Sequence, residues 1–391
     1  MPVPVPTMDL AVPKGESFIN YLINFYNQAS AGPLNISRQF IDEIMARKQD
    51  DNRYFIILPK INRSDTAAAS SSGNAKIIFV KKANPFIQIF RRMYFELFLI
   101  KKIVREYQIE KVIIFGSYSL VRLHVKKMVL VHHSYLLDDD AYAKLDGMAR
   151  LTEIFRRMLF ALTLRSSPIL IVQSDYMRSL LKKKTRLRGN EIVVIANPIS
   201  RNFVNDREKV REYPGNGKFT LFFPSRAHMH KNHEFVLRIA KYLQTACVSD
   251  IHFIITVDPR FIKGKDIIKK IVDENLGDIV ENIGELPQSE LPRYYKKCSA
   301  LFFPSETETF GNPLIEGMFY GLPVIAPDLP YAVEICGKAG CFYEPGSVGS
   351  AMAQINALRN KDAYLKQCLL SVEQAKKYPE VKEWVDQYLN L

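Results

Sequence analysis

The sequence predicts two α/β domains in tandem, each built on a parallel β-sheet. The chain has 391 residues, more than one hydrophobic core usually holds, so two domains are expected. Short β-branched or aromatic runs alternate with longer amphipathic stretches, a pattern typical of parallel sheets covered by helices on both faces. A polar stretch with Gly and Pro at 197–218 divides this pattern and predicts the linker.

The expected strands are short apolar runs between polar or helical segments. They are 53–58, 76–80, 111–116, 127–132, 168–173 and 191–195 in the first domain, and 219–223, 251–256, 278–283, 299–304 and 322–326 in the second. We expect the first domain to span residues 1–200 and the second to span residues 201–370. A C-terminal helix in 371–391 is expected to pack back on the first domain through an apolar face that includes Trp384.

Composition excludes several classes of protein. A hydrophobic fraction of 47% with 24% charged residues is ordinary globular usage, not that of a disordered, collagen-like or disulfide-rich chain. The longest uncharged apolar runs are shorter than the roughly 18 to 20 residues that a membrane-spanning helix needs. The start of the sequence shows no secretory signal, and the five cysteines lack metal-ligand spacing, so reduced thiols in a cytosol are expected.

Positive charge is concentrated in the first half of the chain. Residues 1–200 hold 30 Lys and Arg against 17 Asp and Glu, whereas the remainder holds 24 of each. Such a half is suited to an anionic partner, although a solvated basic surface is the alternative. Segments 81–105 and 178–188 mix apolar with basic residues and predict docking on an anionic membrane, unless 81–105 is a core helix.

The densest set of chemically informative residues lies in 302–331. A strand there ends in a turn, and a helix is expected to begin near a Gly-Asn-Pro sequence, with the proline in its first turn. The free backbone N–H groups at the start of such a helix can bind a phosphate, and the segment in question comprises Phe310, Gly311, Asn312, Pro313 and Leu314. Glu308 could reach a reacting sugar, while Glu316 could accept hydrogen bonds from ribose hydroxyls.

A second turn carries two basic residues. In 219–233 a strand runs into a loop that holds Arg226 and Lys231. A diphosphate is bound well by the fork of donors of an arginine together with the point charge of a lysine. A basic surface loop is the simpler alternative.

Together these motifs resemble the GT-B glycosyltransferases of family 4, a large retaining group. The hallmark of that group is Glu-x7-Glu in a segment similar to PSETETFGNPLIEGMFYGLPVIA, preceded by an Arg-x4-Lys turn. Further landmarks appear in order at 29–46, 131–134 and 283–305, and the resemblance extends over 29–345.

The resemblance implies a function and its setting. The fold would be two Rossmann-like domains facing across a cleft, with the acceptor on the first and the nucleotide sugar on the second. The activity would be retaining transfer of a hexose or related sugar from a nucleotide diphosphate donor to a glycan or lipid-linked acceptor, in surface polysaccharide or lipopolysaccharide biosynthesis. It implies no metal, no cofactor beyond the nucleotide-sugar substrate and no nucleic acid. The protein would be cytoplasmic and peripheral on the inner face of the plasma membrane.

The resemblance also assigns roles residue by residue. It implies that Glu308 contacts the transferred sugar, Glu316 the ribose, Arg226 and Lys231 the diphosphate, the backbone at Leu286 the nucleobase, and Gly32 the phosphates as part of a closing loop. The paired glycines of that loop appear here as Ala31-Gly32, which makes close backbone approach less assured. His132 and His133 compete for the catalytic-cleft histidine; His133 is favoured because it precedes Ser134, where the strand should end.

Two other patterns suggest metals, and both are set aside. Asp138 to Asp140 satisfy an Asp-x-Asp pattern but lie in an acidic loop, and His228, His230 and His233 lack supporting Cys or carboxylate spacing. Two other functions remain open. One is a nucleotide-sugar epimerase of the same fold, and the other is a non-catalytic protein that binds sugar or nucleic acid.

Overall fold

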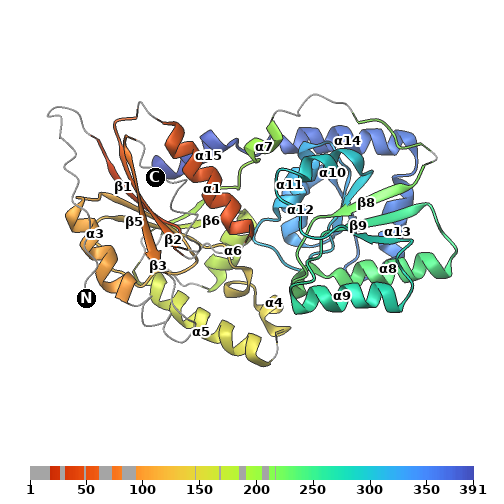
Figure 1. The fold of residues 1–391 in the computed structure, drawn as a ribbon, viewed down its shortest axis with the longest axis horizontal. Coiled ribbons are helices and arrows are strands. Elements are labelled where there is room, and N and C mark those ends of the chain that lie inside the picture. The colour runs from red at the N-terminus through yellow and green to blue at the C-terminus, as the bar shows by residue number, and fades with distance from the viewer. Residues whose placement is uncertain are drawn as a thin grey trace.

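The computed structural model describes residues 18–26, 31–47, 50–60, 73–81, 94–145, 147–166, 169–184, 191–204, 211–215 and 217–391. Two α/β lobes lie side by side, the first coloured red to yellow-green and the second green to blue in Figure 1. Both sheets are parallel throughout, as the alternation of apolar runs and helices predicts.

The first lobe contains a seven-stranded sheet in the order β3-β2-β1-β4-β5-β6-β7. Its strands are β1 (Asn20–Asn24), β2 (Arg53–Lys60), β3 (Ala75–Lys81), β4 (Lys111–Phe115), β5 (Lys126–Leu130), β6 (Ile169–Val172) and β7 (Glu191–Val194). Strand β1 is not among the strands expected from the sequence. It lies inside the sheet between β2 and β4 and is buried along its whole length.

The second lobe contains a six-stranded sheet in the order β10-β9-β8-β11-β12-β13. Its strands are β8 (Phe219–Phe223), β9 (Ile251–Ile255), β10 (Val280–Asn282), β11 (Ala300–Phe302), β12 (Val324–Pro327) and β13 (Gly340–Tyr343). The edge strand β13 is also not among the strands expected from the sequence.

Helices cover both faces of the two sheets. The short helix α7 (Arg201–Val204) buries Phe203 in the core of the second lobe. In the first lobe the helices are α1 (Ala31–Ala46), the π-helical turn η2 (Phe95–Leu99), α3 (Ile100–Glu106), the 3-10 turn η3 (Ser134–Leu136), α4 (Asp139–Ala143), α5 (Gly147–Leu164) and α6 (Asp175–Lys184). In the second they are the 3-10 turn η4 (Met229–Lys231), α8 (His233–Thr245), α9 (Ile262–Asp273), α10 (Leu291–Lys297), α11 (Asn312–Phe319), α12 (Pro330–Cys336), the 3-10 turn η5 (Gly337–Ala339), α13 (Val348–Ala357) and α14 (Lys361–Ala375).

The C-terminal segment differs from the single helix expected at 371–391. The chain forms α14 and then a separate helix, α15 (Val381–Leu389), because Pro379 lies in the stretch between them. Trp384 of α15 is fully buried against the first lobe, with its ring 5.2 Å from that of Phe40 in α1. The chain therefore crosses between the lobes twice, near the paired residues Ile199 and Glu380.

Several sequence expectations fall wholly or partly on residues outside the described ranges. These are the loop at 64–75, the linker at 197–218, the segment 81–105 and the basic run 178–188. The described end of 81–105 buries Phe95 and Ile100 but exposes Tyr94 and Phe98. Within the described ranges, no helix is long and apolar enough to cross a membrane.

Candidate active site

A cleft of about 390 Å³ lies between the lobes, at the carboxyl ends of both sheets. From the first lobe it is lined by residues that follow strands, His132, Gln173 and Asn197, and by Asn35, Ile36 and Gln39 of α1. From the second lobe it is lined by Arg226, Lys231, Leu286, Glu308, Phe310, Gly311, Asn312, Pro313 and Glu316, among others. The topology of open parallel sheets places ligands in such a position.

A lysine and a glutamate form an ion pair at the centre of this cleft. The ammonium of Lys231, at the end of η4, lies 2.5 Å from Oε1 of Glu308, and the hydroxyl of Ser305 donates to the same oxygen. Burial is the largest single influence and favours the neutral form of Glu308, but the charges of Lys231 and His230 together with the hydrogen bonds from Lys231 and Ser305 hold the pKa of the carboxyl below its ordinary value. The site therefore holds a carboxylate and an ammonium side by side, both of them largely buried.

The N-terminus of α11 points its first residues into the cleft. Gly311 caps the helix with a φ of 86°, a backbone conformation that glycine adopts without strain, and Pro313 lies in the first turn. Phe310 to Pro313 line the cleft, but Leu314 does not. The Leu314 side chain is fully buried and its N–H donates to the carbonyl of Gly311, so the expected phosphate contact is not available at that residue.

Glu316 lies on the same wall, one turn further along α11. Its carboxyl is buried and accepts a 2.6 Å hydrogen bond from the hydroxyl of Tyr295 in α10. Burial raises the pKa of Glu316 to about 7. An added hydrogen-bond donor, such as a sugar hydroxyl, would stabilise its ionised form.

Arg226 lines the cleft but forms an ion pair with Glu285, a residue that was not expected at the site. The guanidinium Nε lies 2.8 Å from Oε1 of Glu285, and Arg260 binds the other carboxylate oxygen at 2.9 Å. Glu285 directly precedes Leu286, which lines the cleft as expected. The sequence does show Glu285 as a charged residue beside the anticipated base-binding turn. It does not show the pairing, because Arg226 and Arg260 are distant from Glu285 in the sequence.

The position of Gly32 differs from the expected closing loop. Gly32 is the second residue of α1, so it lies in a helix. Asn35 and Gln39, which lie about one and two turns further along the same helix, line the cleft.

The cleft histidine is His132 and not the favoured His133. β5 ends at Leu130, the chain stays extended as far as His133, and successive side chains of extended backbone point to opposite sides. His132 therefore lines the cleft, and burial followed by the charge of His133 lowers its pKa to about 4. Nε2 of His133 lies 3.0 Å from both carboxylate oxygens of Glu153 in α5.

Three amide side chains connect the lobes across the cleft. Nε2 of Gln173 donates to Oδ1 of Asn197 at 2.5 Å, and Nδ2 of Asn197 donates to Oδ1 of Asn312 at 2.7 Å. Oε1 of Gln173 is buried and has no hydrogen-bond partner within the described ranges. Only Asn312 was expected here; Gln173 and Asn197 could have been found because Gln173 is the last residue of one predicted strand and Asn197 follows another.

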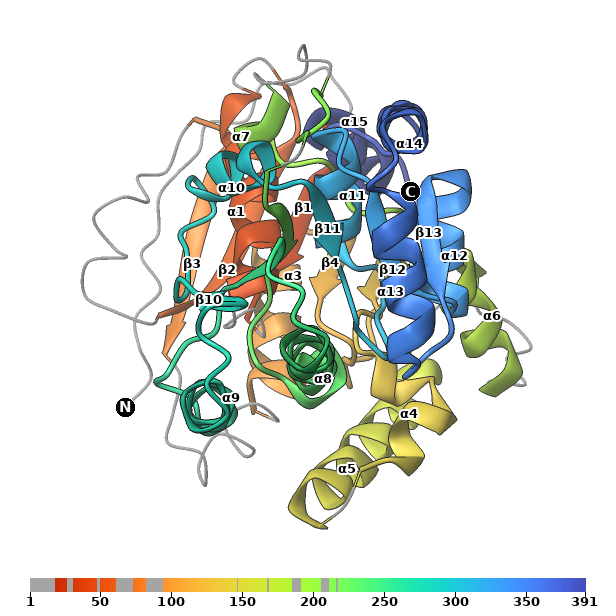
Figure 2. The same cartoon turned by 90° about the vertical axis from the view of Figure 1, so that its right-hand side faces the viewer.

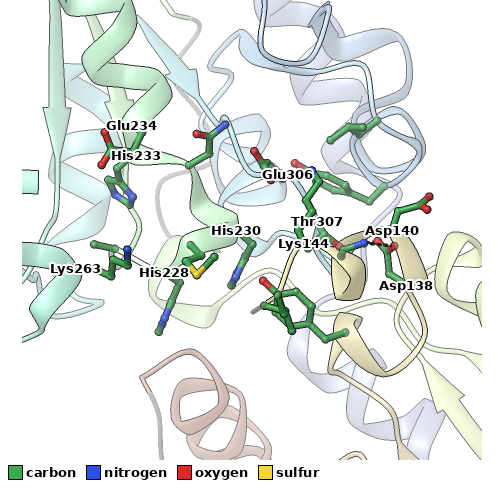
Figure 3. A pocket seen from close by; sticks show the side chains of 18 of the residues that line it. Asp138, Asp140, Lys144, His228, His230, His233, Glu234, Lys263, Glu306 and Thr307 are labelled. Carbon is green, nitrogen blue, oxygen red and sulfur yellow. Dashed lines mark hydrogen bonds and ion pairs between the residues drawn. The ribbon is translucent and has the colours of Figure 1, made fainter. Parts of the chain in front are cut away.

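A second cavity, of about 420 Å³, lies beside the first and shares His228 with it. Figure 3 shows His228 and His230 on one side of it and Asp138, Lys144, Glu306 and Thr307 on the other. The hydroxyl of Thr307 donates to Asp138 at 3.0 Å, and Lys144 bonds Glu306 at 3.1 Å, so residues of both lobes close this wall.

The structure gives the two apparent metal patterns other roles. Oδ1 of Asp138 caps α4 by accepting from the N–H of Ala141, and Oδ2 accepts from Thr307 and Tyr176. Burial lowers the pKa of His230 to about 4 and that of His233 to about 3. Among the described residues, no cluster of three or more His, Cys, Asp or Glu is arranged to hold a metal ion.

Two Rossmann-like lobes that face a common cleft define the GT-B class, which confirms the fold predicted from the sequence. A sequence model described as Glycosyltransferase Family 4 matches residues 50–203, and one described as Glycosyl transferases group 1 matches residues 205–377. The chain belongs to glycosyltransferase family 4, as the motifs indicated.

Curated relatives match part of the chain. The O-antigen chain mannosyltransferase RfbU of Salmonella typhimurium is 26% identical over 195 residues, which are 49% of this chain and 51% of the relative. The O-antigen chain mannosyltransferase B of Escherichia coli is 29% identical over 91 residues, 23% of this chain and 24% of the relative. The chain thus spans about half the length of RfbU, and less of the second relative.

Solved structures match the fold over nearly the whole chain. Sucrose-phosphate synthase from Thermosynechococcus elongatus has a TM-score of 0.72 at 17% identity, covering 95% of this chain and 98% of the other. HepE of Anabaena, in complex with UDP-glucose, has a TM-score of 0.69 at 15% identity, covering 95% and 99%.

Proposed function

We propose that this protein is a retaining glycosyltransferase that moves a sugar, with mannose the first candidate, from a nucleoside diphosphate to a hydroxyl of a glycan or lipid-linked acceptor. The observation that carries the proposal is the largely buried ion pair of Lys231 and Glu308 beside the N-terminus of α11. This arrangement offers positive charge to a diphosphate and negative charge to the sugar attached to it.

The donor is oriented by residues of the second lobe. The backbone N–H groups at the start of α11 and the ammonium of Lys231 bind the diphosphate. Arg226 joins them by exchanging Glu285 for a phosphate oxygen, since a guanidinium binds either anion in the same bidentate way. Glu316 accepts the ribose hydroxyls, and the base lies against the backbone at Leu286.

Charge stabilisation accounts for the chemical step. The bond between the anomeric carbon and the diphosphate oxygen breaks through an oxocarbenium-like transition state, while negative charge grows on the leaving group. The oxygen of the acceptor hydroxyl bonds to the same carbon, and its proton passes to the departing diphosphate. Lys231, Arg226 and α11 stabilise that charge without a metal ion, and Glu308 faces the positive sugar ring. Retention is proposed because family 4 is a retaining group.

The acceptor approaches from the second cavity. His228 lies on the walls of both the second cavity and the cleft. An acceptor glycan bound in the second cavity can therefore reach a donor sugar bound in the cleft. On the cleft side, the neutral imidazole of His132 and the unpartnered Oε1 of Gln173 are placed to receive hydrogen bonds from sugar hydroxyls. The acceptor domain is thus the first lobe and the donor domain the second.

The biological setting is proposed from the relatives. RfbU and mannosyltransferase B are named for O-antigen chains, which supports a role in surface polysaccharide or lipopolysaccharide assembly and mannose as the sugar. The basic first half of the chain supports a cytoplasmic protein attached peripherally to the inner face of an anionic plasma membrane.

A donor panel tests this function. Purified protein is incubated with GDP-, UDP- and dTDP-linked sugars, and release of nucleoside diphosphate is followed with and without acceptor glycans. Release from one donor, raised by an acceptor and matched by a glycosylated product, supports transfer. Interconversion of the donor sugar without transfer would indicate an epimerase, and binding without any turnover would indicate a non-catalytic protein.

A further inference from the structure

The outer face of α5 carries six large apolar side chains that stand in solvent. Their exposed fractions are 77% for Met148, 60% for Leu151, 50% for Ile154, 41% for Phe155, 52% for Met158 and 45% for Leu162. At about 100° of rotation per residue, all six fall within roughly one third of the helix circumference. Single exposed apolar residues are ordinary, but a continuous α5 stripe of this kind marks an interaction surface.

The opposite face of α5 already packs on the first lobe. Glu153, Phe160 and Thr163 are buried there. The carboxylate of Glu153 bonds His133 at 3.0 Å, and Oγ1 of Thr163 accepts from the backbone N–H of Ser119 at 2.9 Å. The α5 stripe is therefore separate from the face that holds the helix in the fold.

The charges on α5 indicate what covers the stripe. Arg150 is exposed near the start of the helix and Arg165 just after its end. The acidic residue within α5, Glu153, is buried and paired with Arg156 and His133. Exposed apolar side chains bordered by arginines fit an anionic lipid surface, where the apolar groups enter the interface and the cations meet the headgroups.

A second copy of the chain fits this surface less well. Two α5 helices packed antiparallel about a twofold axis would bring Arg150 of one copy beside Arg165 of the other. With Glu153 buried, α5 supplies no carboxylate to pair with either arginine, so like charges would meet at both ends of the contact.

We propose that the α5 stripe docks the protein on an anionic membrane, an inference that rests on the proposed transfer to a lipid-linked acceptor. Helix α5 projects from the body of the protein beside α4 (Figure 2). Arg157 of α5 donates to the carbonyl of Tyr135 at 2.7 Å and to Asp139 at 2.8 Å, which ties the helix to the wall of the second cavity. Docking through α5 thus brings the mouth of the acceptor cavity close to the lipid.

Vesicle co-sedimentation of the full chain tests the docking surface. The vesicles contain phosphatidylcholine alone or with phosphatidylglycerol, at low and high salt. The double variant L151Q/M158Q removes two side chains of the stripe, and we expect its partitioning to fall by about tenfold or more. The control is Leu369→Gln, whose side chain is similarly exposed, at 63%. Leu369 belongs to α14, which lies on the second lobe, whereas α5 lies on the first (Figure 1).

Arginine variants and changes in salt concentration test the electrostatic contribution to vesicle binding. We expect R150Q/R165Q to lose most of its preference for phosphatidylglycerol at low salt, and wild-type binding to weaken as salt rises. Binding by L151Q/M158Q equal to that of wild type, or binding indifferent to lipid charge, would overturn the proposal. A dimer in solution that L151Q/M158Q abolishes, without vesicle binding by wild type, would assign the stripe to a second copy.

Donor release in the absence of vesicles separates this inference from the proposed function. The α5 variants are expected to release nucleoside diphosphate from the donor at the wild-type rate, because no residue of the stripe lines either cavity. Vesicle binding without any donor turnover would leave the docking surface standing while the proposed function fails. Donor turnover without vesicle binding would support the proposed function and overturn the docking surface.

Discussion

The carboxylate of Glu308 and the ammonium of Lys231 lie 2.5 Å apart in a cleft bounded by the strand ends of both lobes. Because both side chains are largely buried, removing either charge leaves the other without its partner. The pair therefore has to be tested from both sides, with readouts that separate binding from turnover.

Glu308→Gln is expected to lower the transfer rate by about a hundredfold or more, because the negative charge that faces the oxocarbenium-like sugar is lost. Affinity for the nucleoside diphosphate product should stay within a few fold, since the glutamate does not face the base. Initial rates and calorimetry measure the two quantities. Equal losses of rate and product affinity would contradict the assignment of Glu308 to the sugar.

Arg226→Ala and Lys231→Ala are each expected to lose on the order of 2 kcal/mol or more of transition-state stabilisation, because each removes a charge-assisted donor to the leaving group. The quantity measured is kcat/KM for the donor. Arg260→Ala is the matched control, since Arg260 pairs with Glu285 but does not line the cleft. Activity should also survive a chelator; an absolute need for a divalent cation would argue against metal-independent catalysis.

Glu285→Gln should tighten nucleoside diphosphate binding several-fold, because Arg226 no longer has to leave a charged partner to reach the phosphates. The gain should be absent for the nucleoside without phosphates and absent when Arg226→Ala is added. Calorimetry with both ligands checks this. An equal change for the nucleoside would place the effect at the base instead.

Glu316 predicts a pH dependence of stability with a definite sign. Its pKa is raised to about 7, so the folded protein keeps a proton that the unfolded chain releases near its ordinary pKa of 4.5. Stability from this group is therefore present below pH 4.5 and is lost as pH rises towards 7, by on the order of 3 kcal/mol. Denaturant unfolding at pH 5 and pH 8 should show this loss in wild type but not in Glu316→Gln. A parallel pH response in both proteins would exclude Glu316 as its source.

Glu316 also predicts the pH dependence of nucleotide binding. If ribose hydroxyls donate to this carboxylate, the ligand favours the ionised form, and affinity should rise as pH increases through about 7. Calorimetry with a nucleoside diphosphate across this range measures the slope. In Glu316→Ala, affinity should be weaker and the slope lost; a slope unchanged by the substitution would point to another titrating group.

The fold was predictable wherever apolar runs are long enough to identify a strand. β1 was missed because asparagines at both of its ends interrupt the apolar pattern, although these side chains are buried and hydrogen-bond the backbone. Asn24 accepts from the N–H of Tyr26, and Asn20 donates to the carbonyl of Tyr107. Polar residues that bond the backbone at strand ends carry no signal in a hydrophobicity pattern.

The site was predictable where its residues lie in turns that follow expected strands. Lys231 lies in one such turn, Glu308 and the start of α11 lie in another, and all of them line the cleft. The pairing of Arg226 with Glu285 could not be foreseen because 59 residues separate the two side chains. The α5 stripe was hidden for a different reason. An amphipathic pattern shows that a helix has apolar residues, but not which of two apolar faces the fold will cover.

The return of α15 to the first lobe has a consequence for how the protein is made. Trp384 and Tyr388 are fully buried in the same cluster as Phe40 and Phe115, so the core of the first lobe includes residues from the far end of the chain. During synthesis, the N-terminal sheet leaves the ribosome with part of its hydrophobic surface uncovered. It stays incomplete while the whole second lobe is translated, and a ribosome that stalls before Val381 releases a lobe that cannot close its core.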